Sequence, residues 1–157
     1  MKPFFRFPER CELLKQEMES WFGTPFHQRS HAKGESGGVD CVGLVQDIYY
    51  TLGAIPEMYP LPDYAIDWHK HNEHSMLEDF INIHYADCFL VIDKDDPVMV
   101  GDLLGIIPRG RCIHHAGIVH REDMFAHTML GKGVIENHVR ENYMGFELGK
   151  IFRPIEL

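Results

Sequence analysis

The sequence predicts an α+β fold, in which helices from the first half of the chain pack on one side of an antiparallel sheet. Two observations support this fold class. Up to about residue 90, apolar residues recur at helical spacing between breaks rich in glycine and proline. After Pro97, short apolar or alternating runs are separated by Gly, Pro or charged residues, as in the strands of an antiparallel meander. Helices followed by strands are typical of α+β proteins.

Three helices are expected in the first half of the chain. The first begins at Pro8 and ends before Gly23, and its apolar positions are Leu13, Leu14, Met18, Trp21 and Phe22. The second covers about residues 40–52, with a buried side formed by Val42, Leu44, Val45, Ile48 and Tyr49. The third lies in "SMLEDFINIHYADCFL", residues 75–90. The polar "TPFHQRSHAKGESGG" is expected to be a loop, and the proline-rich "AIPEMYPLPDY" an extended connection.

The second half is expected to supply the sheet. The predicted strands are "GDLLGIIP", "HHAGIVH", "MFAHTML" and "GVIENHV", which begin at residues 101, 114, 124 and 133. The segment "KIFRPI" adds a last strand, and its proline favours a position at the sheet edge.

Composition restricts the class of function. The 157 residues are 45% hydrophobic and 25% charged, which predicts a single globular domain over 1–157. A formal net charge of −9 argues against nucleic-acid binding and against docking on an anionic membrane. The start of the chain is too short and too charged for a secretory signal, and no stretch approaches the length of a membrane span. We therefore expect the chain to be made in the cytoplasm without its own export signal.

Four cysteines are present, and no two of them form a C-x-x-C pair. A chain of this length with a full hydrophobic core does not need disulfides, and this spacing does not favour a structural zinc site. We expect at least three reduced, mostly buried thiols among Cys11, Cys41, Cys88 and Cys112.

Cys41 stands at a border in "GGVDCVGLVQDIYY", between glycines that break structure and an apolar run typical of a helix. Unpaired N–H groups at a helix start favour an anion and can lower a cysteine pKa to about 3.5–7.5. Gly37 and Gly38 leave the approach without side chains, so that a substrate backbone could lie close. Cys41 is therefore a candidate nucleophile, although most helical cysteines are simply buried.

A nucleophilic thiol needs a base and a group that orients the base. Adjacent residues of a strand point to opposite faces, so only one of His114 and His115 can face Cys41. His127 lies on the next predicted strand, and neighbouring strands are about 4.8 Å apart, within reach of such a base. The chain has 11 histidines, so each one taken alone is weak evidence.

Four segments in order, "GGVDCVGLV", "GDLLGI", "HHAGIV" and "FAHTMLGKGVIE", resemble the motifs of the NlpC family of papain-fold cysteine peptidases. These enzymes cut peptides of the bacterial cell wall. The resemblance implies a papain-like fold, with the nucleophile-bearing helix packed on a central antiparallel sheet. It assigns Cys41 as nucleophile, His115 as base and His127 as the residue that orients the imidazole.

Two further segments, "WFGTPFHQRS" and "LPDYAIDW", resemble the branch of this family found in phage and gene-transfer-agent tails. Many members have Tyr where this chain has Phe26 and Ser where it has Val42, and those hydroxyls line the subsite for the substrate amine and the oxyanion. The resemblance implies that Asp40 holds the amine. The oxyanion would then rest on the backbone N–H of Cys41 and a second donor, with Gln28 or His27 as candidates.

The predicted function is a cysteine peptidase or amidohydrolase that cuts peptidoglycan stem peptides through a thioester, with no metal or cofactor. One alternative is an amidase or acyltransferase acting on a small-molecule or peptide amide. Another is a catalytically silent component of a phage tail or secretion assembly. Such an assembly is also the possible partner of this protein. The histidines of "HKHNEH" (His69, His71 and His74) could hold zinc but fit a solvated segment better, and "DKDDP" is expected to be a turn.

Overall fold

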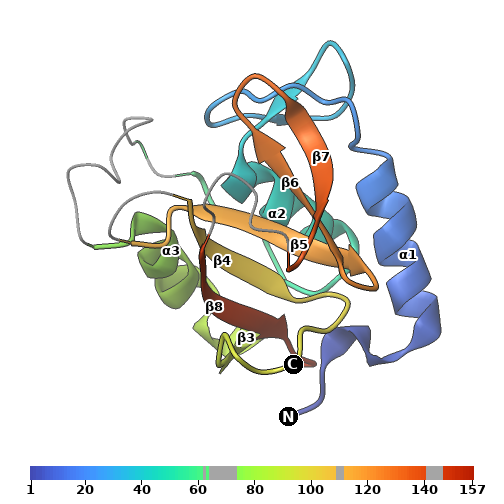
Figure 1. Ribbon diagram of the computed structural model, residues 1–157, viewed down its shortest axis with the longest axis vertical. Coiled ribbons are helices and arrows are strands. Elements are labelled where there is room, and N and C mark those ends of the chain that lie inside the picture. Colours follow the sequence, from blue (N-terminus) through green and yellow to red (C-terminus); the bar gives the residue numbers. More distant parts are fainter. Residues whose placement is uncertain (62, 64–73, 109–111, 141–146) are drawn as a thin grey trace.

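The computed structural model describes residues 1–61, 63, 74–108, 112–140 and 147–157. Within them, a six-stranded sheet has the order β3-β8-β4-β5-β6-β7, and every neighbouring pair is antiparallel (Figure 1). The strands are β3 (Phe89–Ile92), β4 (Leu103–Ile107), β5 (His115–Arg121), β6 (Met124–Met129), β7 (Gly133–His138) and β8 (Glu147–Pro154). The helices are α1 (Pro8–Glu19), α2 (Cys41–Thr51) and α3 (Met76–His84). The predicted α+β class is confirmed.

The main core lies between α2 and the sheet, with α1 and α3 on either side of α2 (Figure 1). Leu44 and Ile48 of α2 pack in one cluster with sheet residues that include Ala116, Ile118 and Ala126. A second, smaller cluster contains Leu104, Ile106, Val119, Phe125 and Ile151, which alternate along the strands with residues of the first cluster. The sheet is therefore apolar on both faces.

The predicted second helix is confirmed, whereas the first differs at its end. All five residues expected on the buried side of α2 are buried. Helix α1 ends at Glu19, and a turn continues from there to Gly23, whose φ is +87°. Leu13 and Phe22 are 53% and 38% exposed, whereas Leu14, Met18 and Trp21 are buried in the core. Three of the five apolar positions predicted for this helix therefore face the core.

Two features of the sheet differ from the prediction. The expected third helix stops at His84, and after a 3₁₀ turn (Ala86–Cys88) the residues "FLVI" form β3. A short apolar run of this kind does not distinguish a strand from a buried helix by periodicity. The segment expected at the edge belongs to β8, which lies between β3 and β4. Pro154 is tolerated there because it is the final residue of β8, beyond the last pair with β4 at Phe152.

The loop between α1 and α2 contains a small hairpin, β1 (His31–Ala32) and β2 (Gly38–Val39), which the sequence did not predict. The turn in "DKDDP" is confirmed, with the Asp96 N–H donating to the Asp93 carbonyl at 3.0 Å. Among the described residues, no helix is long and apolar enough to cross a membrane.

Candidate active site

Asp40 begins helix α2. Its backbone is extended, and one carboxylate oxygen accepts the backbone N–H of Gly43 at 2.8 Å, which makes it the N-cap. The other oxygen accepts the backbone N–H of Arg29 at 2.7 Å, and the side chain is fully buried. The carboxylate expected to hold a substrate amine thus also joins the helix start to the preceding loop.

Glycines around Asp40 allow this loop to lie against the helix. A Cβ at Gly43 would come within 2.6 Å of the Ser30 carbonyl oxygen, which explains a glycine in the first turn of a helix. The space beside Gly38 is filled by the ring of His27, with a distance of 2.3 Å from a built Cβ, and that beside Gly37 by the Ala32 carbonyl. These two glycines therefore accommodate the protein's own loop, and the expectation that they keep this space clear for substrate is wrong.

The Cys41 side chain is 9% exposed and meets the start of β5. Backbone N–H groups of Ala116, Val42 and Cys41 itself contact the sulfur and lower the pKa of the thiol. Burial, followed by the charge of Asp40, acts in the other direction and raises that pKa to about 12. The thiol is thus protonated at neutral pH, and the expected lowering by the helix start does not prevail.

His115, His127 and Asn137 form a hydrogen-bonded chain across three neighbouring strands. Nε2 of His115 lies 2.7 Å from Nδ1 of His127, and Nε2 of His127 lies 2.7 Å from Oδ1 of Asn137. His115 directly precedes Ala116, whose N–H contacts the Cys41 sulfur. The structure therefore brings the three residues predicted to be catalytic to one end of β5.

The imidazole rings of His115 and His127 are both neutral at neutral pH. The pKa of His115 is held well below 6.5 by burial, then by the nearby His127 and His114. Burial also lowers the pKa of His127, which is fully buried, whereas the hydrogen bond that its ring donates to Asn137 favours the charged form and opposes this shift. Each ring therefore carries one proton, and each has one nitrogen able to accept another.

Gly117 permits the close approach of His115 and His127. A Cβ at this position would lie 2.7 Å from Cδ2 of Phe125, 2.9 Å from the Ala126 carbonyl oxygen and 3.2 Å from Cβ of His127. The Phe125 ring packs on His127, with centroids 4.6 Å apart. The glycine of "HHAGIV" is thus explained by the space that the second histidine and its aromatic neighbour occupy.

The remaining predicted site residues lie on the segment that enters α2. Phe26 is half-buried and forms a β-bridge with Val39, two residues before Cys41. Gln28 is half-buried, and His27 is exposed. Thr128, next to His127, donates its hydroxyl to the Val39 carbonyl at 3.3 Å and so connects β6 to this segment. Most of "LPDYAIDW", with His69 and His71, lies outside the described residues.

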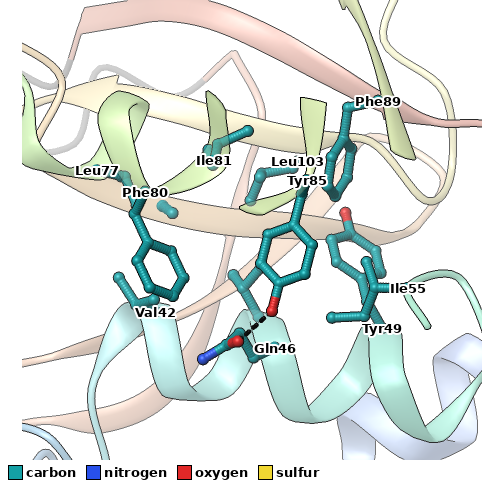
Figure 2. Close-up of a pocket in the computed structure, with 12 residues that line it drawn as sticks. Val42, Gln46, Tyr49, Ile55, Leu77, Phe80, Ile81, Tyr85, Phe89 and Leu103 are labelled. Atoms are coloured by element: carbon teal, nitrogen blue, oxygen red, sulfur yellow. Dashed lines mark hydrogen bonds between the residues drawn. The ribbon is translucent and has the colours of Figure 1, made fainter. Parts of the chain in front are cut away.

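A small apolar cavity lies between α2 and α3 (Figure 2). One of the residues that line it, Val42, directly follows Cys41 in the sequence. It encloses about 20 Å³, room for a single water molecule. Figure 2 shows the phenol of Tyr85 bonded to the Gln46 amide at its rim. The amide of Gln46 also bonds both the N–H and the carbonyl of Tyr59, at 2.9 and 3.1 Å. This cavity is part of the packed core and too small for a substrate group.

Other described groups do not form a metal site. No cluster of three or more His, Cys, Asp or Glu side chains suited to a metal ion occurs in the part of the chain that the structure describes. His74 lies there, with its Nε2 atom 2.7 Å from the carboxylate of Asp79. All four cysteines are free thiols, three of them buried, as predicted.

Asn137 is the residue of this arrangement that the sequence did not reveal. It follows Ile135 by two positions on β7, and Ile135 pairs with His127, so the two share a face next to the histidine. A polar residue at that spacing in "GVIENHV" is the signal that could have indicated it.

Solved structures with the same fold come from the NlpC/P60 proteins. NlpC2 from Trichomonas vaginalis matches with a TM-score of 0.63 and 14% identity over 96% of this chain and 48% of that one. A lipoprotein-like member of the NLP/P60 family from Staphylococcus aureus subsp. aureus Mu50 matches with 0.62 and 19%, over 99% and 44%. The chain thus spans about half the length of these two proteins.

An isolated domain matches along nearly its whole length. The NlpC/p60 domain of the peptidoglycan hydrolase SagA has a TM-score of 0.55 and 15% identity, over 92% of this chain and 98% of the domain. No protein-family model and no curated protein sequence matches the chain. The fold is papain-like, of the NlpC/P60 type, as the sequence motifs predicted.

Proposed function

We propose that this protein is a cysteine peptidase that hydrolyses amide bonds in peptidoglycan stem peptides. The observation that carries the proposal is the placement of the Cys41 thiol at the start of β5, beside the chain of His115, His127 and Asn137. The domain with the same fold in SagA belongs to a peptidoglycan hydrolase, which favours this class of substrate.

In the proposed reaction, His115 takes the proton of Cys41 as the sulfur attacks the carbonyl carbon of the substrate. Backbone N–H groups at the start of α2 would stabilise the oxyanion that forms. The imidazolium then gives its proton to the leaving amine, the C–N bond breaks and a thioester remains. His115 next takes a proton from water, whose oxygen attacks the thioester, and the C–S bond breaks to release the acid and restore Cys41. Phe26, Gln28 and Asp40 are proposed to line the substrate side of this site, and the reaction uses no cofactor.

The test is incubation of the protein with purified sacculi, with released fragments identified by mass spectrometry. New amino and carboxyl ends within stem peptides, absent with a Cys41→Ala variant, are expected. Release of no fragments by the unmodified protein would contradict the proposal. Synthetic small-molecule amides form a second arm, because turnover of these alone would favour an amidase or acyltransferase.

A silent structural component is favoured by the burial of Cys41 next to the carboxylate of Asp40, which raises the pKa of the thiol to about 12. Alkylation by iodoacetamide at pH 7 separates the two functions. In an enzyme, Cys41 reacts faster than the more exposed Cys11, and His115→Ala slows that reaction. In a silent component Cys41 reacts only at strongly alkaline pH.

Delivery to the wall within a phage-like tail is a further part of the proposal, based on the motif "WFGTPFHQRS".

A further inference from the structure

The hydrogen-bonded chain at the site does not end at the second histidine. His127 is fully buried on β6, and its Nε2 atom lies 2.7 Å from the Oδ1 atom of Asn137 on β7. Asn137 pairs with Phe125 across the two strands, so it is diagonal to His127 and held by the ladder between β6 and β7.

We propose that Asn137 is a positioning residue for the peptidase reaction, whose amide oxygen sets the tautomers of both His127 and His115. This inference rests on the proposed function for the reaction that it serves. The assignment of the tautomers follows from the hydrogen bonds and from the neutral state of both buried rings, and it can be tested without turnover.

The amide oxygen of Asn137 determines which atoms donate along this series of hydrogen bonds. A carbonyl oxygen only accepts hydrogen bonds, so Nε2 of His127 must carry the hydrogen that lies between it and Asn137. Both rings are neutral at neutral pH, because burial lowers the pKa of each. The other nitrogen of His127, Nδ1, is therefore an acceptor.

The tautomer of His115 follows from that of His127. Nδ1 of His127 accepts, so Nε2 of His115 donates across their 2.7 Å contact. The acceptor lone pair of His115 must then lie on Nδ1, the ring nitrogen that is not directed at His127. That atom is the one available to take the proton of Cys41, whose sulfur contacts the next residue, Ala116. The opposite pair of tautomers would place a hydrogen on Nδ1 and set two acceptors against each other at Asn137.

The experiment uses protein labelled with ¹⁵N in its histidine rings, because ¹⁵N chemical shifts distinguish protonated from unprotonated ring nitrogens. In the unmodified protein at pH 7.5, His115 and His127 are expected to carry hydrogen on Nε2. In Asn137→Leu, which has the same shape without the acceptor, a population of His115 with hydrogen on Nδ1 is expected. The kcat on stem-peptide fragments falls about tenfold or more with KM unchanged, as for groups that orient ligands or bases.

Two variants serve as controls. Asn137→Asp keeps the acceptor, so it restores the Nε2–H tautomers and most of kcat. The negative charge of Asp also moves the acid limb of the pH–rate profile to higher pH, because it stabilises the charged imidazole. Asn82→Leu makes the same change at an exposed position of α3 and leaves tautomers and kcat unchanged.

The inference is overturned if His115 in the unmodified protein carries its hydrogen on Nδ1, or if the tautomers in Asn137→Leu are those of the unmodified protein. Equal losses of kcat in the Leu and Asp variants without a change of tautomer would show a structural role and also overturn it. A protein that has the expected tautomers, changes them in Asn137→Leu and hydrolyses nothing would refute the proposed function, while the tautomer assignment would stand.

Discussion

Asp102 and Arg153 form a partly buried ion pair with two parallel hydrogen bonds, each of 2.8 Å, between the start of β4 and the end of β8. Asp102 is 1% exposed, and it also accepts the backbone N–H of Met99. The preceding Gly101 has a φ of +96° and lies against the ring of Phe5, and its carbonyl accepts the hydroxyl of Tyr49. The glycine and the aspartate of the "GDL" motif therefore have a structural role, because their contacts hold the start of β4 in place.

Arg153→Met is expected to destabilise the protein by about 3–5 kcal/mol, because it leaves the buried Asp102 carboxylate without its cation. Urea denaturation measures the loss. Arg140→Met, at an exposed position, is the matched control and should stay within about 0.5 kcal/mol. A loss below about 1 kcal/mol in Arg153→Met would show that the carboxylate is solvated in the folded protein.

Cys41→Ala is expected to abolish hydrolysis, because no other group can form the thioester. The side chain is 9% exposed and part of the core cluster, so a stability loss on the order of 1 kcal/mol accompanies the change. Fragment release from sacculi and a melting curve measure the two effects. Cys11→Ser, Cys88→Ala and Cys112→Ala should each keep activity, and residual turnover by Cys41→Ala would refute the covalent mechanism.

His115→Ala should lower kcat by about 10²–10⁴-fold, the usual contribution of a general base. His114→Ala should have a much smaller effect, because His114 directly precedes β5 and adjacent residues of an extended chain point in opposite directions. Steady-state kinetics of the two variants provide the comparison. The reverse order of effects would mean that His114 is the base.

Gly117→Ala is expected to lower kcat and to destabilise the protein by about 1–3 kcal/mol, because its Cβ would overlap Phe125 and the Ala126 carbonyl. Separation of β5 from β6 would lengthen the contact between His115 and His127. Gly105→Ala is the control on β4, since its nearest neighbours, at 3.1 Å, are ends of side chains. If both variants keep full activity, the close approach is not needed for function.

Stability should decrease as the pH falls below 6.5. Burial lowers the pKa of His115, His120 and His127 in the folded protein, whereas in the unfolded chain a histidine titrates near 6.5. Below that pH the unfolded chain binds more protons than the folded one, which favours unfolding. Urea midpoints at pH 7.5 and 5.5, at constant ionic strength, test this, and the difference should shrink in His120→Gln. An equal or higher midpoint at pH 5.5 would contradict the prediction.

Local sequence patterns predicted the elements that depend on local physics. Helix α2 has an N-cap at Asp40, one continuous apolar side and a stop at Gly53, so its bounds followed from the sequence. Strand β3 and the central place of β8 did not, because they depend on pairing between residues far apart in the chain, such as Phe89 with Pro154. A proline suggested an edge, and only the register shows that it ends the strand.

The candidate site shows the same division. Cys41 and His115 stand close to glycines in the sequence and His127 lies on the next predicted strand, but the contact to Asn137 depends on the register of β6 and β7. The pKa of Cys41 could not be predicted from the sequence either. The helix start favours a thiolate, but the extent of burial, which raises the pKa to about 12, is set by tertiary packing.

The central place of β8 has a consequence for the order in which the protein folds. Strands β4 to β7 are neighbours in the sheet in the order in which they follow along the chain, so they can pair early from local contacts. Strand β3 pairs only with β8 among the described strands, so it has no sheet partner until residues 147–154 insert beside β4. A nascent or truncated chain that lacks this segment would leave β3 unpaired and one edge of β4 open to solvent, and would be prone to aggregation.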